Sequence, residues 1–123
     1  MSIKTNYVLA KTNPVSRYSK KSKIDRLVSY LKLCKDKSVT VEINGAISVP
    51  YFIDQFKISA TENNIAFGDV DCENFPFIIN KESICDINFI DEYDVHLEFS
   101  IVDNYTNLVT TLIVYCGDAN IFG

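Results

Sequence analysis

The single histidine of the chain, His96, is the residue best suited to acid–base chemistry, because an imidazole titrates near neutral pH. It lies in an alternating polar and apolar segment, 94–101, with Asp94 two residues before it and Glu98 two residues after it. In an extended strand these three side chains share one face at intervals of about 6.5–7 Å. A catalytic base also needs a pocket and an orienting group, and the sequence places no serine, cysteine or threonine beside His96. We therefore predict a solvated histidine and no enzymatic activity.

An acidic stretch resembles a calcium-binding loop in the alternation of its oxygen ligands, Asp69, Asp71 and Glu73. An EF-hand loop takes glycine at its sixth position and glutamate at its twelfth, whereas Asn74 and Asn80 occupy those positions here. The four glycines of the chain do not form a phosphate-binding cluster. We predict no dedicated metal site and no cofactor.

The cysteines give information about the compartment. No pair has the CxxC spacing of a zinc or redox motif, and we predict reduced thiols at Cys34, Cys72, Cys85 and Cys116. No apolar run reaches the roughly 18–20 residues of a membrane span. The apolar run at 7–10 is also shorter than the core of a signal peptide. These features predict a cytoplasmic protein without a membrane partner.

The first 38 residues are expected to form an arm and a helix. Residues 1–21 are polar and basic, with a turn at 13–14, and predict an arm that includes at most a short edge strand over 6–10. Ser22 and Asp25 then have the spacing of a helix capping box. Apolar residues follow at intervals of three and four, which predicts a helix over 22–36 that docks on a sheet through one stripe.

From Val39 onward the apolar period changes to two, which predicts a β-domain over 39–116. Residues 44–45 are an Asn-Gly pair, typical of a type I′ hairpin turn. Around Pro50 the apolar residues change from odd-numbered positions (47, 49 and 51) to even-numbered ones (52, 56 and 58). This change of parity predicts a bulge or bend in one long strand. Three antiparallel strands are expected over 84–116. The last of them, 108–115, is apolar on both faces and should be central, with one face in the core and the other under the helix.

Together these elements predict a single α+β domain over 22–123, preceded by the 1–21 arm. Its amphipathic helix would pack on a strongly bent antiparallel sheet or a small barrel of about six strands. The predicted architecture is similar in size to SH3-like and Sm-like barrels. No motif supports membership of either family, and the fold class does not determine a function.

The formal net charge of -4 conceals two halves of opposite sign. Residues 1–38 carry ten Lys or Arg and two acidic residues, whereas residues 39–123 carry two Lys and fourteen acidic residues. The halves either neutralise each other across the helix–sheet contact or indicate charged partners.

Our leading hypothesis is a small non-catalytic binding protein. Its acidic β-face would occupy a basic or nucleic-acid-binding surface of a protein partner, in the manner of a phosphate backbone. The residues assigned to this face are Asp69, Asp71, Glu73, Asp91, Glu92, Asp94 and Glu98. Abundant Asn, Ile, Lys and Tyr are typical of AT-rich coding, and favour an inhibitor encoded by a phage or mobile element.

Two other functions are consistent with the sequence. The first is a nucleic-acid-binding module in which basic residues follow phosphates and a tyrosine stacks on a base. The residues assigned to it are Arg17, Tyr18, Lys20, Lys21, Lys23 and Arg26. The second is a structural or assembly subunit that forms homo-oligomers through open sheet edges.

Overall fold

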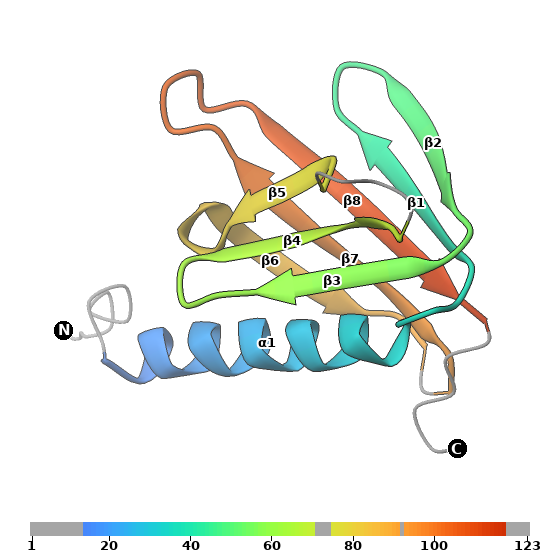
Figure 1. Ribbon diagram of the computed structural model, residues 1–123. Helices are drawn as coiled ribbons and strands as arrows, with labels where there is room; N and C mark the ends of the chain where they lie inside the picture. The colour runs from blue at the N-terminus through green and yellow to red at the C-terminus, as the bar shows by residue number, and fades with distance from the viewer. Residues whose placement is uncertain (1–13, 71–74, 92, 118–123) are drawn as a thin grey trace, which may run out of the picture.

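The computed structural model describes residues 14–70, 75–91 and 93–117, with side chains described from Lys20 onward. Within these ranges it contains one α-helix and eight β-strands (Figure 1). The elements are α1 (Pro14–Leu33), β1 (Val39–Asn44), β2 (Ser48–Ile53), β3 (Phe56–Ala60), β4 (Asn64–Asp69), β5 (Phe77–Asn80), the 3-10 helix η2 (Lys81–Ser83), β6 (Ile84–Phe89), β7 (Val95–Val102) and β8 (Val109–Cys116).

The strands form two antiparallel sheets rather than a closed barrel. The larger sheet has the order β2-β1-β8-β7-β6 and the smaller has the order β3-β4-β5. The smaller sheet and α1 both lie against one face of the larger sheet (Figure 1). Tyr51 of β2 meets Phe77 of β5 at a ring-centroid distance of 5.0 Å, and Tyr30 of α1 meets Phe89 of β6 at the same distance. We call this covered side of the larger sheet the inner face and the opposite side the outer face.

The α+β class and the antiparallel pairing are thus confirmed, but the predicted strand that bends at Pro50 is wrong. Pro50 pairs with Glu42 in an unbroken register that runs to Ile53. The chain then leaves the larger sheet and enters the smaller one at Phe56, whose backbone bonds to the 36–37 turn. The change of parity in the sequence therefore marks a change of sheet. This exchange divides the strands between two layers, so that no single sheet closes on itself.

The β1–β2 hairpin also forms with a different turn. No described glycine has a positive φ, and Asp36 and Asn107 are the only other described residues with a positive φ. The Asn-Gly pair at 44–45 therefore does not form the predicted type I′ turn, which requires positive φ at both central residues. Three residues, 45–47, connect the strands instead, with the Gly45 amide donating to the Ile47 carbonyl at 3.0 Å.

The helix begins at Pro14 rather than at Ser22 and ends at Leu33 rather than at residue 36. Proline suits the first position of a helix because the amide it lacks would have no intrahelical partner there. The signal at 13–14 that we interpreted as a turn therefore marks a helix start, and part of the predicted arm is helical. Residues 1–13, including the predicted strand at 6–10, lie outside the described residues.

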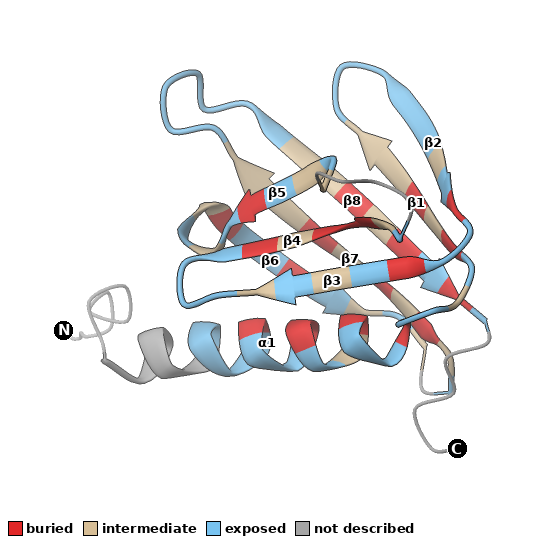
Figure 2. Cartoon of the chain, viewed as in Figure 1, coloured by how far each residue is buried: buried red, intermediate tan, exposed pale blue. Residues whose placement is uncertain are grey.

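The predicted apolar stripe of the helix is confirmed, since Ile24, Leu27 and Leu31 are all buried. They join a single core cluster with side chains from both sheets, such as Val41 and Phe67. Along β1, β7 and β8, buried residues alternate with half-buried or exposed ones (Figure 2). The described residues include no buried polar or charged side chain. Apolar packing between α1, the smaller sheet and the larger sheet therefore holds the layers together.

Two of the predicted thiols are in the core. Cys34, after the end of α1, and Cys116, at the end of β8, are both buried, whereas Cys85 is exposed. Cys85 and Ile87 are two residues apart and would share a face of a regular strand, but an irregularity in the β6–β7 register between Ile84 and Asp86 places them differently. Cys72 lies outside the described residues.

Burial, reinforced by the neighbouring Cys116 thiol, raises the pKa of Cys34 far above its ordinary value of 9.0. The folded state therefore favours the neutral thiol. Because the folded pKa is the higher one, this stabilisation is complete below pH 9.0 and is lost as the pH rises towards the folded pKa. Above that pH we expect the free energy of unfolding to fall more steeply in the wild type than in Cys34→Ala. The two slopes should differ by up to about 1.4 kcal/mol per pH unit. Urea unfolding at a series of alkaline pH values measures this difference. The same pH dependence of the free energy of unfolding in both proteins would contradict it.

Candidate functional site

The central strand of the larger sheet exposes apolar side chains on the outer face. Strand β8 lies third of five, between β1 and β7, as its apolar composition predicted. Leu112 and Val114 are buried on the inner face, whereas Ile113 is half-buried and Tyr115 is 45% exposed. The expectation that the helix covers this second side is wrong, because α1 lies on the inner face (Figure 1). No described segment replaces it there.

Two carboxylates flank the centre of the outer face. Ile113 pairs with Glu42 of β1 on one side and with Glu98 of β7 on the other. Directly paired residues point to the same face of a sheet. Adjacent strands lie about 4.8 Å apart, so the Cα atoms of the two glutamates are separated by about 10 Å. Glu42 accepts a hydrogen bond from the Ser48 hydroxyl at 2.9 Å, and Glu98 accepts one from the Asn88 amide at 3.5 Å. The middle of the face is thus an isoleucine between two acids.

A row that contains three rings lies next to these acids. Tyr115 pairs with Thr40 on one side and His96 on the other, and Thr40 pairs in turn with Phe52. The rings of His96 and Tyr115 meet edge to face with centroids 5.3 Å apart, and Phe52 is 73% exposed. His96 therefore acts as a packing partner of Tyr115, on the same face as Glu98. This row makes the outer face partly apolar as well as acidic.

The described basic side chains are confined to one side of the molecule. The five strands of the larger sheet contain no lysine or arginine, and their outer face carries Glu42, Asp86 and Glu98. The described basic side chains all belong to α1, the turn after it, β3 or η2; they are Lys20, Lys21, Lys23, Arg26, Lys32, Lys35, Lys37, Lys57 and Lys81. The basic side chains therefore lie on the side of α1 and the smaller sheet, where acidic residues such as Glu62 and Asp69 also lie, whereas the charged residues of the outer face are acidic.

The acidic residues assigned from the sequence are only partly brought together. Glu98 lies on the outer face, and Asp94 lies in the turn that precedes β7. Asp91, in the same turn, accepts hydrogen bonds from the backbone amides of Tyr93 at 2.7 Å and Asp94 at 3.3 Å. Its carboxylate therefore organises the β6–β7 connection.

The remaining assigned acids do not extend this surface among the described residues. Asp69 ends strand β4 of the smaller sheet, where it accepts a hydrogen bond from the Asp54 amide at 3.0 Å. That bond fixes the connection between β2 and β3. Asp71, Glu73 and Glu92 lie outside the described residues.

The basic residues assigned to a nucleic-acid module divide between two surroundings. Lys20 and Lys21 line a cavity of about 440 Å³ together with acidic side chains that include Glu62 and Glu82. Arg26 instead lies over the Phe89 ring of β6 at 4.1 Å and donates a hydrogen bond to the Tyr30 hydroxyl at 2.9 Å. Lys23 is exposed, and the side chains of Arg17 and Tyr18 lie outside the described part of the chain.

Sequence reasoning missed three residues of the outer face, Glu42, Ile113 and Tyr115. A signal for each was present: Glu42 occupies a polar position on an alternating strand, and the other two form the second apolar side of β8. Within the described ranges, no group of three His, Cys, Asp or Glu side chains is placed to hold a metal ion. No helix in those ranges is long and apolar enough to cross a membrane.

Comparison with known proteins finds no matching family model, no matching curated protein and no matching solved structure.

Proposed function

We propose that the protein is a small non-catalytic binding protein whose outer face occupies a basic surface of a protein partner. The observation that carries this proposal is the composition of the larger sheet, which has acidic and aromatic side chains on its outer face and no lysine or arginine in its strands. Opposite charges across an interface accelerate association and exclude partners of the wrong sign. A surface of one sign with apolar groups at its centre suits this role.

The arrangement specifies the partner's chemistry. Ile113 and Tyr115 supply apolar contact at the centre, and Glu42 and Glu98 stand on either side. A complementary surface presents an apolar side chain with arginine or lysine about 5 Å to each side, matching the strand spacing. Arginine is favoured because its planar guanidinium binds a carboxylate through two hydrogen bonds.

The size of the outer face is adequate for such a complex. Five strands at about 4.8 Å spacing and six to eight residues at about 3.3 Å give a footprint of roughly 500–650 Å². A typical specific interface buries about 800 Å² on each partner. Side chains at the rim supply the remaining area. The composition of the chain further supports a cytoplasmic inhibitor encoded by a phage or mobile element.

The double charge reversal Glu42→Lys/Glu98→Lys tests the proposal. Both side chains are on a solvent-facing side of the sheet, so the variant should fold, which circular dichroism checks. We expect a partner captured by the wild-type protein to be basic and to bind the variant at least about tenfold more weakly, because two attractive contacts become repulsive. Calorimetric titration of the purified partner measures this change.

The matched control is Asp25→Lys/Glu62→Lys, which makes the same change in net charge on the helix and the β3–β4 turn. It should retain wild-type affinity. Equal weakening by both variants would indicate a response to net charge alone and contradict the proposal. Tight, salt-sensitive binding of DNA or RNA that is lost in Lys20→Glu/Lys21→Glu would favour the nucleic-acid module instead.

A further inference from the structure

Among the strands that the structure describes, three of the four edge strands carry a feature that limits pairing with another strand. An open edge presents unpaired backbone groups, which natural proteins commonly protect with proline, bulges or covering segments. On β2, the bond from Gly45 to Ile47 and the register place Val49 and Tyr51 in hydrogen-bonded pairs with β1. The alternate residue, Pro50, therefore faces the free edge and offers no amide donor there.

The edges at β6 and β3 are protected in other ways. Strand β6 has an irregular register between Ile84 and Asp86, which interrupts a regular ladder. On β3, the outward backbone groups of Phe56 are already paired. Its amide donates to the Lys37 carbonyl at 3.0 Å, and its carbonyl accepts from the Asp36 amide at 2.9 Å.

Strand β5 lacks these protections. The Lys81 amide donates to the Asn63 carbonyl at 2.8 Å, which fixes the alternation of hydrogen bonds between β4 and β5. Ile79 therefore bonds towards β4, while the amide and carbonyl of Ile78 and the amide of Asn80 point to the other side. The Asn80 carbonyl accepts the first bond of the 3-10 helix η2, because Asn80 is the N-cap of that helix. Among the strands that the structure describes, β5 pairs with β4 only.

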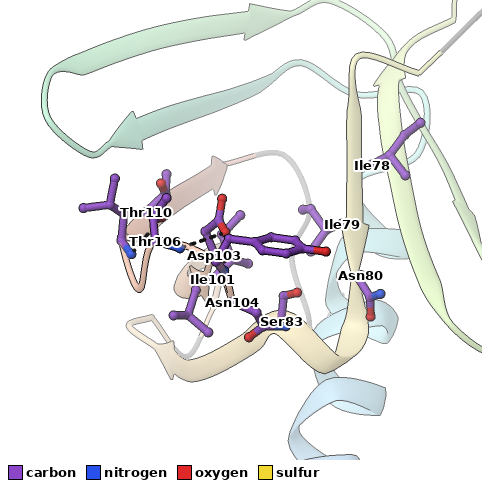
Figure 3. Close-up of a pocket in the computed structure, with 12 residues that line it drawn as sticks. Ile78, Ile79, Asn80, Ser83, Ile101, Asp103, Asn104, Thr106 and Thr110 are labelled. Carbon is purple, nitrogen blue, oxygen red and sulfur yellow. Dashed lines mark hydrogen bonds between the residues drawn. The ribbon is translucent and has the colours of Figure 1, made fainter.

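A cavity of about 620 Å³ adjoins this edge (Figure 3). Ile78 and Ile79 both line it, although Ile78 is 68% exposed and Ile79 is 5% exposed on the opposite side of the strand. A cavity reached by two consecutive strand residues borders the edge of the strand rather than one of its faces. The opposite wall comes from the β7–β8 hairpin and includes Ile101, Asp103 and Leu108. Its volume is within the range of ligand-binding pockets.

We propose that the edge of β5 binds an extended peptide segment of a partner protein by strand addition. The amide and carbonyl of Ile78 and the amide of Asn80 would hydrogen-bond to the peptide backbone, and Ile79, Ile101 and Leu108 would contact its apolar side chains. Among the described residues of the cavity wall, Asp103 alone is charged. Its Oδ1 accepts the backbone amides of Tyr105 and Thr106, so Oδ2 is the atom that would bind a lysine or arginine of the peptide, beside apolar residues at alternate positions. This second site lies apart from the outer face and does not depend on the function proposed above.

The position of the edge favours a peptide over a second copy of the same chain. Two β5 strands can pair directly only where both edges approach each other without obstruction. Here the β7–β8 hairpin forms the far wall of the cavity next to the edge (Figure 3). A single extended segment can enter between that wall and β5, whereas an intact domain would collide with it.

The test compares Ile78→Pro with Ile78→Thr in the full-length protein. Proline removes the amide that points into the cavity without removing a bond to β4, and threonine retains the amide while reducing the apolar surface. A library of short random peptides displayed on phage is selected on the immobilised wild-type protein. We expect enriched peptides with alternating apolar residues and a lysine or arginine. A synthetic copy should bind Ile78→Pro about tenfold more weakly than Ile78→Thr.

N-methylation of the synthetic peptide gives an independent measurement. Two peptides are made, one methylated on its odd-numbered amides and one on its even-numbered amides. One of them should lose binding and the other should keep it, because only every second amide faces β5. Failure to enrich any peptide, or equal affinity for both Ile78 variants, would overturn the proposal. So would a dimer that dissociates in Ile78→Pro, which would identify a second copy as the occupant, or peptide binding that requires removal of residues 1–13, which would identify the chain's own segment.

Discussion

Replacing Phe67 with alanine is expected to lower the free energy of unfolding by about 3–5 kcal/mol. The side chain is fully buried in the middle strand of the smaller sheet. Its ring stacks on Phe77 with centroids 4.7 Å apart and packs against Phe56 at 5.5 Å. Alanine would leave a cavity lined by these rings, which are held by their own strands and cannot close it.

This loss would be a large fraction of the roughly 5–15 kcal/mol that stabilises a typical domain. The matched control is Phe52→Ala, which removes the same group from a position that is 73% exposed. It should change stability by no more than about 0.5 kcal/mol. The chain has no tryptophan, so urea unfolding is best followed by circular dichroism. Similar losses for both variants would contradict the packing of the smaller sheet on the larger one.

Replacing Leu27 with alanine is expected to cost about 2–5 kcal/mol. This side chain is fully buried in the middle of the helical stripe, and α1 contacts β3, β6 and β7. Leucine and alanine both favour the helix, so the expected loss comes from the cavity between the layers. The isolated helix would remain intrinsically as stable as before.

The control for the helix is Leu33→Ala in the last turn of α1, where the side chain is 43% exposed. We expect a loss well below 1 kcal/mol there. The midpoints of urea unfolding of the two variants are compared. If the free energy of unfolding depends equally on urea concentration in both, the difference between the midpoints isolates the contribution of burial. A Leu27 variant as stable as the Leu33 variant would show that the helix is not docked through its predicted stripe.

The core predictions and the binding predictions concern different sides of the same sheet. Leu112 and Val114 of β8 point into the core, while Ile113 and Tyr115 point outward. Variants of the outer face should therefore affect binding without the losses expected at Phe67 or Leu27. This separation allows partner binding to be tested in a folded protein.

Local patterns within single elements could be predicted from the order of the residues alone. The spacing of Ile24, Leu27 and Leu31 was sufficient to identify the buried side of the helix, because side chains three and four residues apart share a helical face. The alternation along β7 and the apolar composition of β8 similarly identified a core strand and a central strand. These properties depend on the order of residues within one element, which is what periodicity reports.

The neighbours of each strand and the elements that cover each face depend instead on packing between distant parts of the chain. The pairing of Val41 with Val114 joins distant parts of the chain, and no local pattern specifies such a contact. The passage from β2 to β3 resembled a bend in one strand because a change of sheet produces the same change of parity. The outer face with Glu42, Ile113 and Glu98, and the open edge of β5, likewise exist only once the layers are assembled. An apolar pattern shows that a side chain can be buried, whereas the packing of other elements decides whether it is.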